Sequence, residues 1–373
     1  MKKLLGIVLS AAMLLSMAAC GSTAASSAAS SAAADSTADA ATATDAAASD
    51  LKVGVITIGD ETEGYTAAHI NGIKAAAQKL GMSDSQIVWK YKVPEGAECS
   101  DAAEDLVGQG CNLVVSNSYG HQTYIVEEAE KYPDVTFVSM TGDFAALTGL
   151  DNFKNAFTNV YESRYVAGVV AGMKIAELDK EGKIEAKNKT KDGKVKIGYV
   201  GAFPYAEVVS GYTAFYLGAK SVNPDVTMYV NYTNEWSDAT KEATNAKALI
   251  DQGCDVISQH SDTSAPATTA QNNGVFAVGY NDDMIPVAPD AALVSARVNW
   301  GAYYEYALKC LIDGEAIDQD WCGSYAEGAC YLSPFNDAII ADGTKEAIEK
   351  AAAGLADGSV QVFAGPLHGK DAD

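Results

Sequence analysis

LVGQGCNLVVSNS, at residues 106–118, returns later in the chain as LIDQGCDVISQHS, at residues 249–261. In each copy a helical pattern ends at glycine, an apolar strand follows, and polar residues stand just past the strand. Open α/β sheets bind ligands beyond the carboxyl ends of their strands. The duplication therefore predicts two similar lobes that face each other across a ligand site. The equivalent positions in the two copies are Asn117 with His260, and Ser118 with Ser261.

Strands and helices alternate along most of the chain, from the apolar strand at residues 52–59 to the strand at residues 275–279. This alternation implies an α/β fold in which each lobe has a parallel sheet flanked by helices on both faces. A further helix over residues 296–313 is expected to return to the first lobe, and the remaining chain to cross back, so three strands form the hinge. The expected boundaries are residues 51–145 plus about 285–325 for lobe 1, and about 146–284 plus 326–373 for lobe 2.

The amino-terminal segment reads as an export signal followed by a tether. Residues 1–20 contain two lysines, an apolar stretch and small residues, and they end in LSMAAC, which resembles a bacterial lipobox with Cys20 as the acylated residue. Plain secretion with a free Cys20 is the alternative. Residues 21–50 are Ala, Ser, Thr, Asp and Gly, a composition that predicts disorder. We therefore expect a lipid-anchored body at the cell membrane that faces outside the cytoplasm.

The net charge and the cysteine content limit the classes of partner that the chain is expected to bind. A formal net charge of −23 at pH 7 argues against nucleic acid, whose phosphates require a basic surface, and suits a neutral or cationic small ligand. The seven cysteines contain no CxxC pair that would suggest zinc. Cys322 and Cys330 flank a glycine-containing loop and could form a disulfide outside the cytoplasm, although the sequence fixes no connectivity. We expect no metal and no cofactor, and a monomer.

Enzyme motifs are missing from the sequence. It contains no GxSxG elbow, no phosphate-binding GxxxxGK[ST] loop, no HExxH pair and no EF-hand spacing. None of the four histidines neighbours a cysteine in a nucleophile pattern. We therefore expect ligand capture without catalysis.

Four longer stretches carry a family resemblance: YESRYVAGVVAG at 161–172, IGYVGAFP at 197–204, AKSVNPD at 219–225 and NWGAYY at 299–304. Together they resemble the basic membrane protein, or purine nucleoside receptor A, family of lipid-anchored solute-binding proteins that serve ABC importers. The resemblance implies a type I periplasmic-binding-protein fold. It also implies that the protein captures a purine nucleoside or nucleobase and delivers it to permease and ATPase subunits.

The same resemblance implies an aromatic sandwich around the base, with Tyr65 from lobe 1 and Phe203 from lobe 2. Two departures from the family pattern concern the ribose contacts. The segment DETEGYTAAH, at residues 60–69, replaces the DKSFN-type motif of many members. The lysine that many relatives place before the last helix is not obvious, since Arg297 and its neighbours occupy that region.

Further candidates stand just past the expected strands, independently of the family. Tyr65 opens a helix after a glycine, and His69 follows one turn later on the same face, so both can reach the cleft. For His69 a structural role with backbone hydrogen bonds is the alternative, and for Phe203 packing at the hinge. Asn117 and His260 are supported by the repeat. Tyr119 follows directly after the first copy of the repeat.

Carboxylates and tryptophans complete the candidate set. A buried carboxylate that accepts two N–H bonds suits the edge of a purine, and Asp282 is the leading candidate, with Asp262 as a second. Asp238 is a ligand candidate, with capping of the helix that begins after it as the alternative. Trp236 in a polar loop suits stacking or a hinge contact. Trp300 closes the site or anchors its own helix.

Two alternatives to purine uptake remain open at this point. A sugar-type ligand suits the same fold, because aromatic rings and carboxylates also bind sugars. A ligand-binding sensor that serves no importer is compatible with the sequence, because docking to a permease leaves no short motif. Neighbouring genes for a permease and an ATPase would separate import from sensing.

Overall fold

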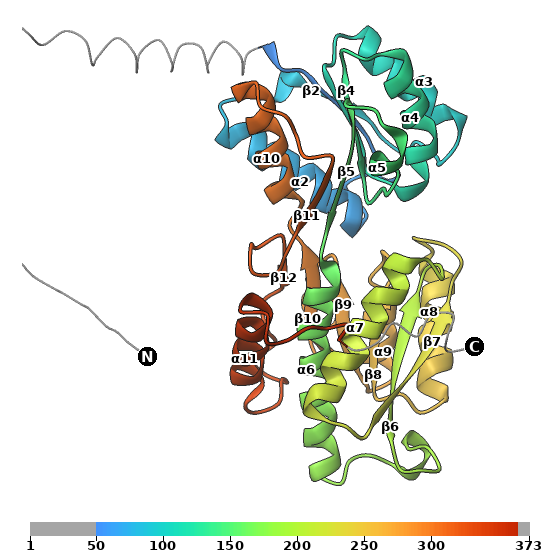
Figure 1. Ribbon diagram of the computed structural model, residues 1–373. Helices are drawn as coiled ribbons and strands as arrows, with labels where there is room; N and C mark the ends of the chain where they lie inside the picture. Colours follow the sequence, from blue (N-terminus) through green and yellow to red (C-terminus); the bar gives the residue numbers. More distant parts are fainter. Residues whose placement is uncertain (1–49, 365–373) are drawn as a thin grey trace, which may run out of the picture. The chain divides into compact units, whose positions relative to one another are not determined.

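The computed structural model describes residues 50–364. The export signal at 1–20, the acylation site Cys20 and nearly all of the linker at 21–50 lie outside the described residues. Within them the chain forms two six-stranded sheets with helices packed against them (Figure 1). The described part has no helix that is both long and apolar enough to cross a membrane.

The first sheet belongs to lobe 1 and has the strand order β11-β5-β4-β3-β1-β2, with every neighbouring pair parallel. Its strands are β1 (Val53–Ile56), β2 (Ile87–Lys90), β3 (Leu113–Ser116), β4 (Thr136–Met140), β5 (Phe153–Thr158) and β11 (Asp320–Gly323). The helices of this lobe are α2 (Gly64–Lys79), α3 (Ala97–Gly108), α4 (Gln122–Lys131), α5 (Ala145–Thr148) and α10 (Trp300–Asp313). Helix α10 packs against α2, as Figure 1 shows.

The second sheet belongs to lobe 2 and has the order β12-β10-β9-β8-β6-β7. Its strands are β6 (Val195–Gly201), β7 (Val226–Tyr232), β8 (Val256–His260), β9 (Phe276–Tyr280), β10 (Ala292–Val298) and β12 (Cys330–Leu332). Only the β10–β12 pair is antiparallel within the described sheet. The helices are α6 (Val160–Lys180), α7 (Ala206–Val222), α8 (Ala239–Asp251), α9 (Ala265–Asn272) and α11 (Thr344–Ala356). The expected fold class of two lobes with helix-flanked parallel sheets is confirmed.

The repeated stretches occupy equivalent places in the two sheets. Strand β3 pairs with β1 and β4, and β8 pairs with β6 and β9. The helix before each strand ends at a glycine with positive φ, Gly110 at 87° and Gly253 at 92°, where an L-residue would be strained. Both strands are fully buried, as expected for central strands covered on both faces. The repeat thus sets where each lobe's central strand ends.

The described chain crosses three times between the sheets: from β5 to α6 at Asn159, from β10 to α10 at Asn299, and from β11 to β12. Two of these crossings lie later than the boundaries near 145 and 285 that the sequence suggested. Strand β5 extends lobe 1 because it pairs with β4 and β11. Residues 292–298 form a strand of lobe 2 between β9 and β12, and the helix expected from residue 296 begins only at Trp300.

Helices α6 and α7 pack together at unusually close range. A Cβ atom on Gly168 of α6 would lie 2.0 Å from the carbonyl oxygen of Phe215, and one on Gly218 of α7 would lie 1.9 Å from that of Tyr165. Each glycine therefore lets the backbone of the other helix approach. Helix α6 begins at the first crossing between the lobes. Its contacts with α7 and with β10 hold it against the body of lobe 2.

Candidate functional site

A cavity lies between the carboxyl ends of the strands of both lobes. It contains about 380 Å³ of space not filled by atoms, part of it open to solvent. Lobe 1 contributes residues that follow β1, β3 and β4, and lobe 2 contributes residues at or beyond the ends of β6, β7, β8 and β9. This is the place where open α/β sheets bind ligands. The lining residues are Ile58, Tyr65, Asn117, Ser118, Tyr119, Thr141, Glu207, Trp236, His260, Asp262 and Tyr280.

On the lobe 1 side, Tyr65 and Asn117 form one connected wall. The Tyr65 hydroxyl donates to the carbonyl oxygen of Asn117. The Asn117 side chain accepts from the backbone N–H of Ile58 at 2.8 Å and donates to the Thr66 hydroxyl at 3.3 Å. Asn117 therefore lines the cavity as expected, but its amide already joins the end of β1 to the start of α2. Its main role in this geometry is to hold Tyr65 and the wall in place.

His69 and Trp300 lie behind Tyr65 rather than in the cavity lining. The His69 ring is fully buried and stacks on Trp300 at 4.3 Å between ring centroids. Its Nδ1 lies 2.8 Å from the Tyr304 hydroxyl, and burial lowers the pKa of His69 well below its usual value, so the ring stays neutral. Tyr65 meets both rings edge-on. The face of α2 expected to carry His69 into the cleft is covered by α10.

The remaining lobe 1 residues follow β3. Ser118 donates its hydroxyl to Glu95 at 2.6 Å, and the same carboxylate oxygen accepts from the Gly120 N–H at 2.8 Å. The Tyr119 hydroxyl lies 3.3 Å from an oxygen of Asp143. Ser118 and Tyr119 are therefore placed by a polar framework of lobe 1. Ser261, the repeat partner of Ser118, is buried outside the lining.

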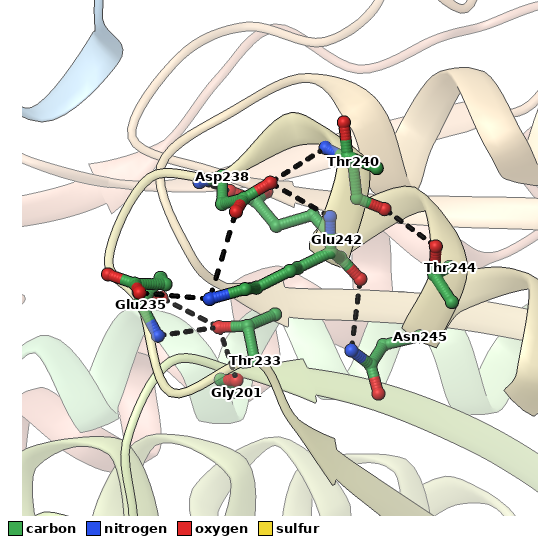
Figure 2. A network of polar contacts seen from close by, with 9 residues as sticks. Gly201, Thr233, Glu235, Asp238, Thr240, Glu242, Thr244 and Asn245 are labelled. Carbon is green, nitrogen blue, oxygen red and sulfur yellow. Dashed lines mark hydrogen bonds and ion pairs between the residues drawn. The ribbon is translucent and has the colours of Figure 1, made fainter.

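On the lobe 2 side, the loop after β7 carries Trp236 into the cavity. Figure 2 shows the polar contacts around this loop. The Thr233 hydroxyl donates to the carbonyl oxygen of Glu235 at 2.6 Å, and Lys241 pairs with the Glu235 carboxylate at 2.9 Å. The Asp262 N–H donates to the Trp236 carbonyl oxygen at 2.9 Å. The loop is thus tied to both the start of α8 and the end of β8, which gives Trp236 a fixed position.

Asp238 caps helix α8 and is not part of the lining. Its carboxylate accepts from the backbone N–H groups of Thr240 and Lys241, both at 3.0 Å (Figure 2). This is the structural alternative that the sequence left open. Glu242, one turn on, accepts from the Ser261 hydroxyl at 2.9 Å and thereby binds α8 to the segment that carries Asp262.

Phe203, the expected second ring of the sandwich, lies behind Trp236. It stacks on Tyr205 with centroids 5.0 Å apart and meets Trp236 edge-on at 5.3 Å. Trp236 lines the cavity from lobe 2, together with the rings of His260 and Tyr280, and Phe203 does not. Tyr205 also contacts Tyr119 of lobe 1 at 5.8 Å between centroids, so this aromatic group reaches across the lobes.

The two expected carboxylates differ in position. Asp262 lines the cavity and accepts from the Asn281 amide at 3.1 Å. Asp282 lies outside the lining, its side chain is 56% exposed, and it lies 3.8 Å from Arg297. The chain turns at Asn281, which has a φ of 60°, directly after β9. Beyond this left-handed residue, Asp282 lies outside the cavity lining and beside Gly64 of lobe 1.

Burial and like charges raise the pKa of Asp262 well above its ordinary value. Burial is the largest cause, and the carboxylates of Glu63, Glu242 and Glu207 act in the same direction. The hydrogen bond from Asn281 opposes the shift. None of the described residues that line the cavity is lysine or arginine. The cavity therefore favours ligand groups that donate hydrogen bonds and disfavours phosphates.

His260 stands at the end of β8, as the repeat indicated, with its Nε2 3.3 Å from Glu207. Its ring packs on Tyr280 at 4.7 Å, and the buried Arg164 guanidinium covers the Tyr280 ring at 3.6 Å. Burial lowers the pKa of His260, the Arg164 charge lowers it further, and Glu207 opposes both. A neutral His260 leaves the cavity without a positive side chain at neutral pH.

Sequence reasoning missed four lining residues: Ile58, Thr141, Glu207 and Tyr280. Each lies at or soon after a strand end, so the same positional rule could have found them. Thr141 directly follows β4 with a φ of 63°, matching Asn281 after β9 in the other lobe. A β-branched residue in this conformation is uncommon, and such residues cluster at functional sites. Among the described residues, no group of three or more His, Cys, Asp or Glu side chains could hold a metal ion.

Comparisons with known proteins agree with this geometry. A model of the family described as "ABC transporter substrate-binding protein PnrA-like" matches residues 52–323. A purine-binding protein of Brucella abortus (strain 2308) is 35% identical over 322 residues, which cover 86% of this chain and 85% of that protein. A relative from Haloferax volcanii, named for glucose binding in an ABC transporter, is 33% identical over 245 residues, 64% of this chain and 57% of its own length. The crystal structure of a solute-binding protein of an ABC transporter system from Aeropyrum pernix K1 shares the fold, with a TM-score of 0.67, 16% identity and coverage of 85% of this chain and 94% of its own.

Proposed function

This chain belongs to the PnrA-like family of ABC transporter substrate-binding proteins, and we propose that its cavity binds a purine nucleobase or nucleoside for import. The family resemblance read from the sequence is thereby confirmed. Substrate-binding proteins of ABC importers work outside the cytoplasm and present their ligand to a transporter. The identity of the ligand and the lipid anchor at Cys20 are part of the proposal.

One observation carries the proposal: Tyr65 and Trp236 line the same cavity from different lobes, beside the carboxyl of Asp262. A planar base offers two faces to such rings, and stacking of a base on an aromatic side chain contributes about 1–3 kcal/mol. The purine edge offers N–H groups to the Asp262 oxygen that Asn281 leaves free. The lack of lysine and arginine in the lining disfavours nucleotides. The identity to a purine-binding protein of similar length supports the same ligand class.

Capture then depends on the hinge. A ligand that contacts residues of both lobes favours the arrangement in which the lobes are joined through it, because only that arrangement offers all of its contacts. The hinge for this motion consists of the three crossings between the lobes, which lie near Asn159, Asn299 and residues 323–330. The protein needs no chemical step for this task, and the transporter would read the ligand-bound form.

A sugar is the second candidate ligand. The 33% identity to the Haloferax relative named for glucose binding favours it, and rings and carboxylates in a cavity also suit sugars. The carboxyl of Asp262 does not separate the two ligands, since sugar hydroxyls donate hydrogen bonds as well. Only binding measurements distinguish them.

The test is a thermal-shift screen followed by calorimetry on residues 51–373, refolded from denaturant to remove carried-over ligand. Purines should stabilise the protein and sugars should not. Trp236→Ala should then weaken purine binding by about 5- to 150-fold, the equivalent of 1–3 kcal/mol. Tyr91→Ala is the matched control, because this exposed ring stacks only on Trp89 outside the cavity. A response to sugars alone would overturn the purine assignment and leave the family assignment standing.

A further inference from the structure

Two cysteines flank the third crossing between the lobes, and ligand capture uses neither of them. Cys322 lies in β11 of the lobe 1 sheet, and Cys330 is the first residue of β12 in the lobe 2 sheet. Both are free thiols in the structure. We propose that Cys322 and Cys330 form a disulfide that ties the two lobes together at this crossing.

The backbone of the loop between them brings the pair together. A Cβ atom on Gly323 would lie 2.4 Å from the Cβ atom of Ala329, so these two residues face each other directly. The loop they enclose is closed by a hydrogen bond from the Ala329 N–H to the Ser324 carbonyl oxygen at 3.0 Å. Side chains alternate along extended chain, so the residues one step outward, Cys322 and Cys330, share the opposite face. A short loop that folds back on itself in this way can bring its two flanking residues within the Cα distance of roughly 4.4–6.8 Å that a disulfide requires.

Asn159 gives a second, independent observation, because it contacts both thiols. The Cys322 sulfur lies 3.1 Å from the side-chain oxygen of Asn159, and the Cys330 sulfur lies 3.3 Å from the carbonyl oxygen of the same residue. Asn159 itself stands at the first crossing and donates its N–H to the Gly323 carbonyl oxygen at 2.8 Å. Both sulfur atoms therefore converge on one residue of the hinge. The Cys322 side chain is exposed and therefore has room to rotate toward Cys330.

The location and the unequal exposure of the thiols suit oxidation by thiol–disulfide exchange. Disulfides persist outside the cytoplasm, where substrate-binding proteins of ABC importers work. The exposed Cys322 thiolate attacks a small disulfide such as oxidised glutathione and releases one glutathione thiol. The buried Cys330 thiolate then attacks the Cys322 sulfur and releases the second. Two protein thiols are oxidised, one glutathione disulfide is reduced, and the two protons that the protein thiols lose are taken up by the two released glutathione thiolates.

Burial raises the pKa of the Cys330 thiol to about 12 and also raises that of Cys322. Exchange should therefore be faster in mildly alkaline solution, where more thiolate is present. The bond closes the short loop from 322 to 330 and prevents β11 and β12 from separating at this crossing. Oxidation should raise Tm by roughly 2–5 °C.

The experiment uses the purified full chain, exposed to oxidised glutathione at about pH 8.5 and then alkylated. Glu327 is the one acidic residue between the two cysteines, and Glu315 separates Cys310 from them. Digestion with a glutamate-specific protease therefore places each cysteine on its own peptide. The expected result is a joined Cys322–Cys330 peptide pair that a reductant separates.

Three variants sharpen the result. Cys322→Ser and Cys330→Ser should each abolish the joined pair and the rise in Tm on oxidation. Cys310→Ser, which removes a buried thiol on α10, should retain both. Recovery of separately alkylated Cys322 and Cys330 peptides would overturn the proposal. So would glutathione that stays on Cys322 without transfer, because it would show that Cys330 is out of reach.

Discussion

Asp262→Asn should stabilise the ligand-free protein and weaken ligand binding. The buried carboxylate lowers the stability of the ligand-free protein, but it accepts a hydrogen bond from the bound ligand. The pKa of Asp262 is raised above the ordinary value of 3.8, chiefly by burial. A carboxyl with a raised pKa in the folded state contributes its full stability below about pH 4 and loses it as pH rises through the raised pKa. Asparagine has the same shape, keeps an oxygen for the Asn281 amide and carries no charge.

The expected size follows from the surroundings of this group. A buried polar group without adequate partners costs about 1–3 kcal/mol, and 1 kcal/mol shifts Tm by roughly 2–4 °C in proteins of about 200 residues. For this longer chain we expect Asp262→Asn to raise the Tm of the ligand-free protein by at least about 1 °C near pH 7.5. The difference should vanish near pH 4, where the wild-type carboxyl is protonated.

Binding should change in the opposite direction. Loss of a hydrogen bond to a charged acceptor costs about 1.5–3 kcal/mol, which corresponds to about a 10- to 150-fold rise in Kd for a purine. Wild-type affinity should fall as pH is lowered through the pKa of Asp262, and the affinity of the variant should be flat over that range. Calorimetry at several pH values measures both curves.

Asp282→Asn is the matched control for this experiment. Asp282 has a half-exposed side chain outside the cavity lining, with a long contact to Arg297 and a place beside Gly64, so both Tm and Kd should stay close to wild type. If Asp262→Asn lowered Tm at pH 7.5, Asp262 would not be an uncompensated carboxyl. If Asp262→Asn left Kd unchanged, the carboxyl would make no hydrogen bond to the ligand.

Three further substitutions test residues that stabilise the fold but do not line the cavity. Asp238→Ala should lower stability in urea by about 1 kcal/mol through loss of the α8 cap, with Kd within about threefold of wild type; a larger change in Kd would show that the cap positions the Trp236 loop. Tyr304→Phe leaves Nδ1 of the buried His69 without its partner and should cost about 1–3 kcal/mol in the same assay, and an unchanged urea midpoint would mean that water replaces the hydroxyl. Gly168→Ala places a Cβ atom 2.0 Å from a backbone oxygen of α7 and should destabilise by roughly 3 kcal/mol or more; a wild-type Tm by circular dichroism would show that the two helices separate easily.

The sequence was sufficient to locate the cavity because the repeat marks where strands end. Asn117 and His260 occupy the same position in the two copies, and both line the cavity. Tyr119 and Trp236 follow strand ends by the same rule and also line it. A polar residue after a buried strand must lie at the sheet edge, so this inference depends on chain order alone.

Which neighbour faces inward could not be read from the sequence. Phe203 and Trp236 both follow strands of lobe 2, yet only the side-chain packing on Tyr205 shows that Phe203 supports the tryptophan. From the sequence, Asp282 is the leading carboxylate candidate and Asp262 the second, although each stands two residues past the end of its strand. Only Asp262 lines the cavity, and the chain turns at Asn281, which has a positive φ, before it reaches Asp282.

His69 illustrates a different limit. Its spacing from Tyr65 correctly places both residues on one face of α2, but the partner of that face comes from the distant helix α10. Trp300 and Tyr304 fill the space that a ligand was expected to occupy. A helical pattern fixes which side chains share a face, and only tertiary packing decides whether that face meets another helix or a cavity.

The charges of the cavity connect its chemistry to the hinge. Glu63 belongs to lobe 1, and its negative charge raises the pKa of Asp262, which belongs to lobe 2. Two ionised carboxylates on opposite lobes repel each other. In the ligand-free protein this repulsion disfavours the arrangement in which the lobes lie close together. A ligand N–H that binds Asp262 offsets this repulsion only when the lobes are together, and it therefore shifts the equilibrium toward that arrangement. A proton on Asp262 removes the same repulsion without a ligand, so acidification should draw the empty lobes together while it removes the acceptor that the ligand needs.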